Sequence, residues 1–360
     1  MTLRLERFIL EMENAGFDGA IVSPGANFYY LTGFNLHETG ERPTLLVISS
    51  DGAYHLLAPA MYRNQISNFP VTFWSDGENP YHKLSWIFGE LKLSGGRLLV
   101  ENTMRADWLI NILKLGNGRF ELHPLSQVIR ELRMRKDEKE IKLMEHAAKV
   151  VDRVFDELLT WDLLGISERE LALKIELRIR ELSDGISFEP IVASGENAAN
   201  PHHEPGERKL RKGDMVILDY GARWRGYCSD ITRTIAIGKP NERLVEIYET
   251  VREAQEKAFR TVREGVMARE VDSAAREAIS KAGYGEYFPH RTGHGLGLEV
   301  HEEPYIGPDG DVVLGEGMTF TIEPGIYVPG LGGVRIEDDV AVVDGRGRRL
   351  TRSDRELILL

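Results

Sequence analysis

The stretch from residue 214 to residue 238, "DMVILDYGARWRGYCSDITRTIAIG", places acids where a strand should be apolar. Two apolar runs flank "ARWRG", which predicts a β-hairpin. Asp219 interrupts the first run, and Asp230 directly precedes the second. Aspartate is depleted in strands, and burying an unpaired carboxylate is costly. With residues 224 and 225 as a two-residue loop, Asp219 and Asp230 are predicted to lie directly opposite each other.

A second pair of acids occupies "GMTFTIEPGIYVPGLGGVRIEDDVAVV", residues 317–343. Glu323 ends one β-rich run and Glu337 lies inside the next, so a loop of odd length would make them face each other. A strand acid can instead pair with an arginine, and Arg233 and Arg335 are available. Four carboxylates on paired strands, however, repel one another unless a cation or a shared proton neutralises them. The two pairs together therefore favour a metal site.

A histidine set among glycines can complete such a site. His294 lies in "RTGHGLGLEVHEEP", residues 291–304. The stretch lacks the G-x-G-x-x-G spacing between a strand and a helix that a phosphate loop needs. Oxygen ligands suit Mn, Mg, Ca or Fe, and an added imidazole favours Mn, Co or Zn. The glycines at 293, 295 and 297 are predicted to let substrate and metals approach the backbone closely.

The composition limits the classes of partner and the cellular location that the chain can have. The chain has 360 residues, 42% hydrophobic and 28% charged, with a net charge of −12. This acidity argues against a nucleic-acid partner, which needs clustered Lys and Arg. No apolar run reaches the roughly 18 residues of a membrane span, and the N-terminus reads as an amphipathic helix and not as a signal peptide. The single cysteine, Cys228, favours a reducing cytoplasm.

Element patterning predicts two domains, 1–125 and 126–360. The first alternates helices and strands and is expected to be α/β with a mixed sheet. The second begins with helical patterns at 128–159 and 167–182, the latter opened by a capping box in "SERE". Further helices at 241–263 and 268–282 precede another group of strands, which indicates an internal duplication. Histidines of the first domain are predicted to be surface or core residues and not ligands: His37, His55, His82 and His123.

The whole set resembles the pita-bread metallopeptidases, peptidase family M24. The motifs that carry the resemblance are "DYGARWRGYCSDITRT", "GHGLGLEVHEEP", "TIEPGIY" and "VRIEDD", with "ASGENAANPHHEPG" similar to an upstream histidine loop. "NFYYLTGF" resembles the accessory domain of prolidases and Xaa-Pro aminopeptidases. The fold implied is α/β (α+β), with a creatinase-like mixed-sheet domain before a pita-bread catalytic domain of pseudo-twofold repeat.

The resemblance also implies site roles for individual residues. Two divalent ions, Mn, Co or Zn, would activate a hydroxide for attack on the peptide carbonyl. The implied metal ligands are Asp219, Asp230, His294, Glu323 and Glu337, with Asp230 and Glu337 bridging the two ions. Glu323 would also move the proton, and His202 and His301 would stabilise the tetrahedral intermediate or orient the substrate.

The implied substrate is a small peptide with proline at its second position. Three residues are candidates to bind it: His203, the alternative to His202; Arg335, which could instead neutralise a buried carboxylate; and Tyr305, which stands where many prolidases carry an arginine. The leading interpretation is a cytoplasmic, homodimeric Xaa-Pro dipeptidase (prolidase). The alternatives are an Xaa-Pro aminopeptidase acting on longer peptides, a creatinase-like enzyme that hydrolyses a C–N bond without metal, and a non-catalytic binding module.

Overall fold

The computed structural model describes residues 3–36 and 40–360, so His37 lies outside the described residues. The chain forms two compact units, Met1–Arg133 and Met134–Leu360. The boundary expected from the sequence, between residues 125 and 126, falls at the start of helix α5 (Ser126–Met134). None of the described helices is both long enough and apolar enough to cross a membrane.

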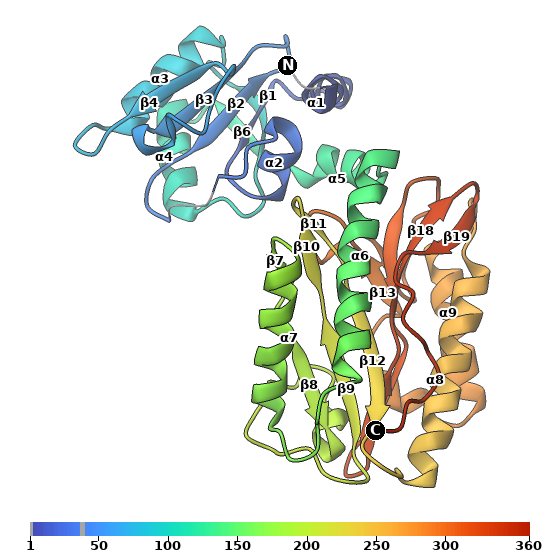
Figure 1. Ribbon diagram of the computed structural model, residues 1–360. Helices are drawn as coiled ribbons and strands as arrows, with labels where there is room; N and C mark the ends of the chain where they lie inside the picture. Colours follow the sequence, from blue (N-terminus) through green and yellow to red (C-terminus); the bar gives the residue numbers. More distant parts are fainter. Residues whose placement is uncertain (1–2, 37–39) are drawn as a thin grey trace. The chain divides into compact units, whose positions relative to one another are not determined.

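The first unit is the expected α/β layer with a mixed sheet. Its strand order is β4-β3-β2-β1-β5-β6, with antiparallel β1–β2 and β2–β3 pairs and parallel β1–β5, β3–β4 and β5–β6 pairs. Helices lie on both sides of this sheet (Figure 1), and α3 and α4 share one core with alternate strand residues. The elements are α1 (Leu3–Asn14), β1 (Gly19–Val22), α2 (Ala26–Thr32), β2 (Leu45–Ser49), β3 (Tyr54–Pro59), β4 (Val71–Trp74), α3 (Pro80–Glu90), β5 (Gly96–Val100), α4 (Ala106–Gly116) and β6 (Phe120–Pro124).

The second unit begins with two helices followed by strands. Helices α6 and α7 pack on β8, β9 and β12 in one hydrophobic core, and the predicted capping box of Ser167 and Glu170 opens α7. These elements are α6 (Glu138–Leu158), α7 (Glu168–Leu182), β7 (Gly185–Ile186), β8 (Ile191–Ser194), β9 (Met215–Tyr220), β10 (Ala222–Trp224), β11 (Tyr227–Cys228) and β12 (Ile231–Ala236).

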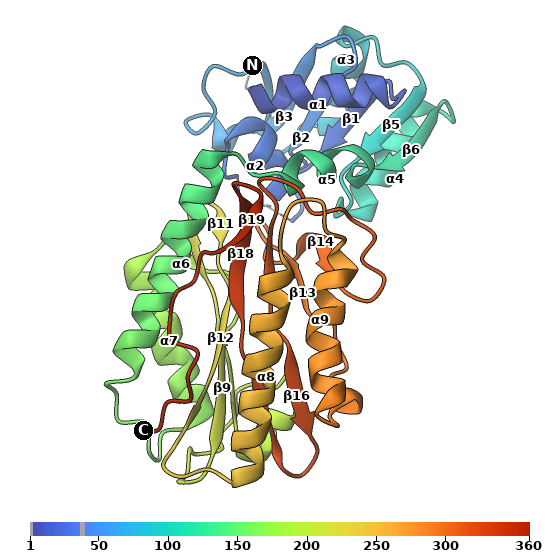
Figure 2. The ribbon, with the colours of Figure 1, turned by 90° about the vertical axis from the view of Figure 1, so that its right-hand side faces the viewer.

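A second pair of helices and a second group of strands complete the unit, as the predicted duplication requires. Helices α8 and α9 cover the other side of the strands (Figure 2) and pack with β15 to β18 in a separate core. The two halves meet where Glu337 N–H donates to the Thr232 carbonyl at 3.0 Å. The elements are α8 (Glu242–Thr261), α9 (Ala268–Lys281), β13 (Gly293–Gly295), β14 (Glu302–Ile306), β15 (Thr319–Ile322), β16 (Gly325–Val328), β17 (Gly332–Arg335), β18 (Asp338–Val343) and β19 (Arg346–Arg349).

Two local predictions were wrong. The helical region 128–159 is interrupted between α5 and α6, because Asp137 caps α6 in a capping box with Glu140. The first hairpin turns at Arg225 and Gly226, both with positive φ, instead of at residues 224 and 225. A two-residue turn of this type needs positive φ at both positions, which glycine adopts without strain. Asp219 consequently pairs with Thr232 and not with Asp230.

The second hairpin follows the predicted register. Its loop has three residues between Val328 and Gly332, which pair directly. The β15–β18 ladder continues in the same register with Ile322 opposite Asp338. Glu323 and Glu337 therefore fall opposite each other between the two ladders.

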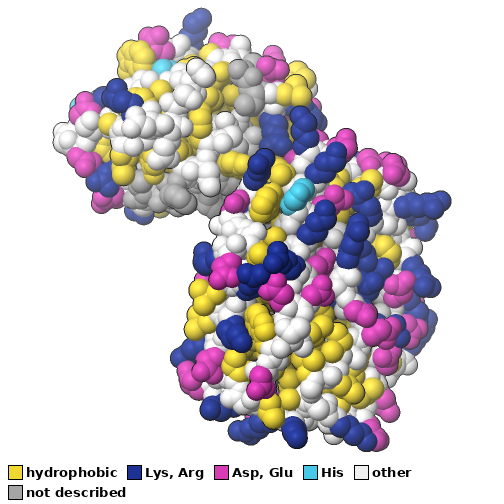
Figure 3. Space-filling model, in the orientation of Figure 1, with side chains coloured by type: hydrophobic (Ala, Val, Ile, Leu, Met, Phe, Trp, Pro, Cys, Tyr) yellow, Lys and Arg dark blue, Asp and Glu magenta, His cyan; other side chains and the backbone are white. Residues whose placement is uncertain are grey.

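The surface of the second unit carries charges of both signs. Figure 3 shows Lys and Arg side chains interspersed with Asp and Glu over the helical face in view. Mixed charge of this kind is typical of a solvated helix face and not of a surface that tracks phosphates.

Candidate metal centre and active site

A cavity of about 450 Å³ opens within the second unit. Its wall includes the five predicted metal ligands together with His202, His301 and Arg335. His203 and Tyr305 are not among the described residues that line it. The full lining is Phe188, Ile191, Pro201, His202, Asp219, Asp230, His290, Arg291, His294, Val300, His301, Glu323, Arg335 and Glu337.

The ligand candidates converge from five places in the fold. Asp219 lies on β9, and His294 lies on β13, while the three other acids stand just outside strand ends. His294 Nε2 is 3.3 Å from Glu323 Oε1 and 3.7 Å from Asp230 Oδ2. One ligand atom each from Asp230, His294 and Glu337 lies within 4.8 Å of the others. This spacing allows a single cation to bind all three.

The buried carboxylates lack hydrogen-bond partners where a cation would be expected. Asp219 Oδ1, Asp230 Oδ1 and Glu337 Oε1 are buried and accept no hydrogen bond from the described residues. Burial raises the pKa of both Asp230 and Glu337 well above the usual carboxylate range, and repulsion from neighbouring carboxylates adds to it. Burial also raises the pKa of Glu323 to about 7. Buried, unpaired oxygens of this kind fit divalent cations.

The histidine of the cluster is oriented to act as a ligand. His294 Nδ1 donates to the Gly295 carbonyl at 3.1 Å, which leaves Nε2 unprotonated and directed at the acids. Burial lowers the pKa of His294 to about 3, so the ring is neutral. The ring of His301 stands edge-on to it, with centroids 4.2 Å apart. A backbone bond that fixes the tautomer is the usual support for a metal-bound imidazole.

Arg335 serves the site through Asp219. Its Nη2 donates to Asp219 Oδ2 at 2.5 Å, Nε donates to Thr232 Oγ1 at 3.1 Å, and Nη1 donates to the Tyr327 hydroxyl at 2.9 Å. Tyr327 in turn lies 2.9 Å from His290 Nε2. Arg335 is only 3% exposed, and all three nitrogens of its guanidinium donate hydrogen bonds. The geometry favours neutralisation of a buried carboxylate over binding of a substrate.

The glycines around His294 serve a different purpose from the predicted one. A Cβ at Gly293 would collide with the Thr321 carbonyl oxygen, and a Cβ at Gly295 would meet the backbone of Glu302 and Glu303. A Cβ at Gly297 would lie 2.5 Å from Glu302 Oε1. Neighbouring segments of the protein itself, and not substrate or metals, therefore occupy the space. The glycines allow β13 to fit closely between β14 and β15.

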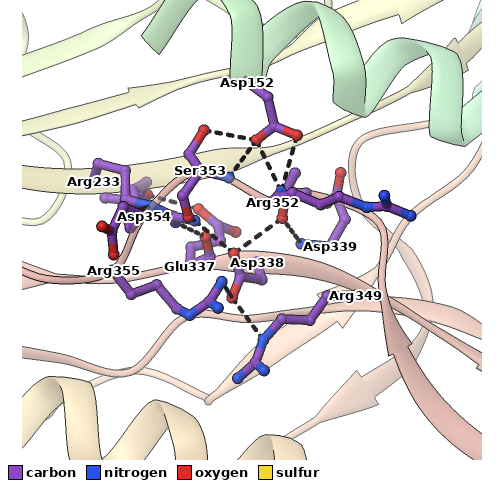
Figure 4. Close-up of polar contacts among 12 residues, drawn as sticks. Asp152, Arg233, Glu337, Asp338, Asp339, Arg349, Arg352, Ser353, Asp354 and Arg355 are labelled. Carbon is purple, nitrogen blue, oxygen red and sulfur yellow. Dashed lines mark hydrogen bonds and ion pairs between the residues drawn. The ribbon is translucent and has the colours of Figure 1, made fainter. Parts of the chain in front are cut away.

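A polar cluster around Arg233 supports the backbone at Glu337 (Figure 4). Arg233 Nη2 donates to Asp338 Oδ1 at 2.7 Å, and Nη1 donates to the carbonyls of Thr232 and Glu337. Asp339, the next residue along, accepts the Asp230 N–H at 3.1 Å. The backbone at Asp230 and at Glu337, two of the ligand candidates, is thus fixed by buried charges. Sequence reasoning missed this support, although "VRIEDD" contains three consecutive acids.

The two predicted residues outside the cavity have other contacts. His203 Nε2 lies 2.8 Å from Glu168 Oε2, a fully buried carboxylate that also accepts from Ser194 and Asn197. The Arg291 guanidinium lies over the ring of Tyr305, with 4.1 Å between the guanidinium carbon and the ring centroid. Six lining residues were not predicted as site residues, since apolar side chains and a histidine or arginine beside a motif give no distinctive signal: Phe188, Ile191, Pro201, His290, Arg291 and Val300.

Comparison with known proteins agrees with this geometry. Residues 142–344 match metallopeptidase family M24, and residues 4–135 match the Creatinase/Prolidase N-terminal domain. The chain belongs to metallopeptidase family M24. All five ligand candidates, with His202 and His301, lie inside the M24 match.

Three relatives illustrate the similarity. A crystal structure of a dipeptidase from Pyrococcus horikoshii OT3 has a TM-score of 0.98 and 70% identity, covering 99% of this chain and 100% of that one. A recombinant prolidase from Thermococcus sibiricus has a TM-score of 0.96 and 52% identity over 99% of this chain and 98% of the other. A Xaa-Pro dipeptidase of Pyrococcus horikoshii is 37% identical over 99% of both chains. This M24 chain is therefore similar over nearly its whole length to enzymes named for dipeptide hydrolysis.

Proposed function

We propose that this M24 metallopeptidase hydrolyses Xaa-Pro dipeptides, as a prolidase does. One observation carries the proposal: four acids and one neutral histidine converge in a cavity, and three of the buried carboxylate oxygens accept no hydrogen bond from the described residues. Similarity to proteins named dipeptidase and prolidase supports the choice of substrate. The homodimer and the cytoplasmic location stay predictions from the sequence.

The proposed cofactor is a pair of divalent ions, Mn, Co or Zn, held by the predicted ligands. When bound, such ions polarise the scissile carbonyl and lower the pKa of a water that attacks it. The residues that would hold them are Asp219, Asp230, His294, Glu323 and Glu337. The buried carboxylates would then be neutralised by the ions and not by protons.

Three lining residues are assigned roles in proton transfer and in stabilising the oxyanion: Glu323, His301 and His202. Glu323 is the candidate to take a proton and return it to the departing amine, because its carboxylate lines the cavity within the ligand cluster, 3.3 Å from His294 Nε2. Burial lowers the pKa of His301, so its neutral ring can donate a hydrogen bond to the developing oxyanion. His202, on the same cavity wall, is placed for a similar contact.

An apolar part of the wall suits the proline ring. Phe188, Ile191 and Val300 line the cavity beside the charged cluster. The Xaa-Pro bond has no N–H, so an enzyme cannot recognise it through that donor. Recognition through ring packing and ion binding does not require the missing hydrogen.

The test combines metal analysis with three substrates. The protein is stripped with a chelator, reloaded with Mn, Co or Zn, and offered Met-Pro, a Met-Pro-Xaa tripeptide and creatine. We expect metal-dependent release of proline from Met-Pro, with bound ions counted by mass spectrometry. An Asp230→Asn/Glu337→Gln variant should bind fewer ions and be inactive. Absence of metal-dependent proline release would overturn the proposal, and cleavage of the tripeptide alone would indicate an aminopeptidase.

A further inference from the structure

A buried ion pair lies next to His301 along the chain. Lys136 Nζ is 2.7 Å from Glu302 Oε1, and the two side chains are only 2% and 9% exposed. Lys136 lies in the connection between α5 and α6, outside the M24 match of residues 142–344, whereas Glu302 begins β14. Both residues belong to the second unit. The pair therefore joins the connection that precedes α6 to the segment that carries His301.

We propose that Lys136 and Glu302 are positioning residues for His301, and that their ion pair fixes the chain beside His301 so that its ring faces the reacting carbonyl. The inference rests on the proposed function, because it requires that His301 stabilises the oxyanion of peptide hydrolysis. Neither Lys136 nor Glu302 is among the described residues that line the cavity. Both would therefore act through His301 and not on the substrate or the ions.

The His301 ring depends on its backbone for its direction. The ring stands edge-on to the ring of His294, with centroids 4.2 Å apart, but no hydrogen bond or ion pair joins it to another described residue. A side chain without such a bond can exchange between staggered rotamers. A donor to an oxyanion, however, must stand within hydrogen-bond distance of it. Contacts of the neighbouring residue, Glu302, are thus the means of placing the ring.

Both carboxylate oxygens of Glu302 accept hydrogen bonds. Oε1 accepts from Lys136 Nζ at 2.7 Å, and Oε2 accepts from the Glu299 N–H at 3.3 Å. Glu302 also pairs with Gly295 between β14 and β13, one position from His294. A hydrogen bond between an ammonium and a carboxylate is stronger than one between neutral groups. The pair thus fixes Glu302 relative to the strand that carries the metal-ligand histidine.

Two glycines leave room for the pair. A Cβ at Gly297 would lie 2.5 Å from Glu302 Oε1 and 2.9 Å from Lys136 Cε, so a side chain there would displace both partners. The Lys136 N–H donates to the Gly317 carbonyl at 2.9 Å, and a Cβ at Gly317 would lie 2.4 Å from the Lys136 carbonyl oxygen. Lys136 is therefore held through its backbone as well as through its ammonium.

A contribution to stability alone does not account for this arrangement. Removing an ammonium and a carboxylate from water costs about as much free energy as their attraction returns, so a buried pair is often no more stabilising than apolar residues of similar volume. The pair instead adds direction, because its charge-assisted bond restricts where the carboxylate can lie. Stability and catalysis should consequently respond differently when the pair is replaced by apolar side chains.

The experiment measures Met-Pro hydrolysis, ion content and thermal unfolding of the metal-loaded full chain. Lys136→Met should lower kcat at least tenfold, with KM changed less than twofold and the number of bound ions unchanged. Its melting temperature should fall, because Glu302 stays buried without its counter-charge. Lys136→Met/Glu302→Met removes both charges, so the melting temperature should return towards that of wild type while kcat stays low. Lys139→Met, at an exposed lysine on α6, should leave kcat and melting temperature unchanged.

A second comparison tests whether Lys136 acts through His301. In a His301→Ala background no ring remains to be placed, so Lys136→Met should lower kcat less than twofold further. If Lys136→Met does not fold, Lys136→Met/Glu302→Met gives the same comparison in both backgrounds.

The remaining outcomes separate this inference from the proposed function. A kcat that recovers together with the melting temperature in Lys136→Met/Glu302→Met would mean that the pair only stabilises the fold. A tenfold loss in the presence and in the absence of His301 would equally overturn the positioning role, and in both cases the dipeptidase activity stands. If metal-loaded wild type releases no proline from Met-Pro, the proposed function fails, and the role of the pair fails with it.

Discussion

The Arg335 guanidinium lies 2.5 Å from Asp219 Oδ2, and this buried ion pair sits inside a cluster of carboxylates. It explains how the chain can fold around four acids before any ion binds, because part of their charge is already balanced. Breaking a buried pair from one side leaves an uncompensated charge and costs about 3–5 kcal/mol.

Arg335→Met should therefore destabilise the chelated protein strongly and the metal-loaded protein less, since bound ions replace the missing charge. Thermal unfolding with chelator and with Mn measures the difference. Asp219→Asn/Arg335→Met should recover much of the loss in chelator, because the charge left behind is removed. Equal losses in both states would mean that Arg335 does not balance the cluster.

Stability should respond to pH in opposite directions with and without ions. Burial raises the pKa of Glu323 from an ordinary value of 4.5 to about 7, so the folded protein binds its proton more tightly than the unfolded chain. Without ions, the contribution of Glu323 to the free energy of unfolding is most favourable below about pH 4.5 and falls as pH rises to about 7. Each pKa unit corresponds to about 1.4 kcal/mol.

Bound ions reverse this decrease of stability with rising pH, because they require deprotonated ligands and bind more tightly as pH rises. The gap in melting temperature between Mn-loaded and chelated protein should thus widen from pH 5 to pH 8. Glu323→Gln should reduce the pH dependence of the chelated protein over this interval, and the other buried acids with raised pKa, Asp230 and Glu337, should keep the remainder. A gap that narrows with rising pH would contradict the assignment of the buried acids as ligands.

The sequence predicts the strands of the site better than the pairing between them. Side-chain parity alone places Asp219 and Asp230 on the same face, and a register shifted by two residues preserves that parity. The shift itself follows from the turn, because Gly226 tolerates positive φ and Trp224 does not. For Glu323 and Glu337 the loop length is unambiguous, so their register was predictable.

Long-range support could not be predicted in the same way. Two partners of Asp338, Arg233 and Gln255, come from residues far away in the chain. No local periodicity connects such residues, so only the tertiary structure reveals which arginine balances which acid. The same holds for Arg291, whose contact with Tyr305 depends on how the two chain segments pack.

The Arg233–Asp338 pair should control ion binding without contacting an ion. Both side chains are at most 2% exposed, and Arg233 Nη1 also donates to the Glu337 carbonyl (Figure 4). Asp338→Asn should lower stability by about 3–5 kcal/mol, because it leaves the guanidinium buried without its counter-charge. It should also weaken ion affinity, and added Mn should restore part of the activity.

A matched control is available on the same carboxylate. Arg355 approaches Asp338 Oδ2 at 3.3 Å and is 29% exposed, so Arg355→Gln should cost less than about 1 kcal/mol. Isothermal titration with Mn gives the affinities. Unchanged Mn affinity in Asp338→Asn at temperatures where it is folded would mean that the pair stabilises the fold only.

The adjacent histidines His202 and His203 should respond to substitution in opposite ways. His202 lines the cavity, so His202→Ala should lower kcat by about 100-fold, as removal of one oxyanion donor does, with an unchanged melting temperature. His203 instead bonds the buried Glu168, so His203→Ala should cost about 1–3 kcal/mol of stability and leave kcat nearly intact. Steady-state kinetics and thermal unfolding of both variants distinguish the two roles. If His203→Ala loses more kcat than His202→Ala, His203 is the catalytic histidine and His202 is not.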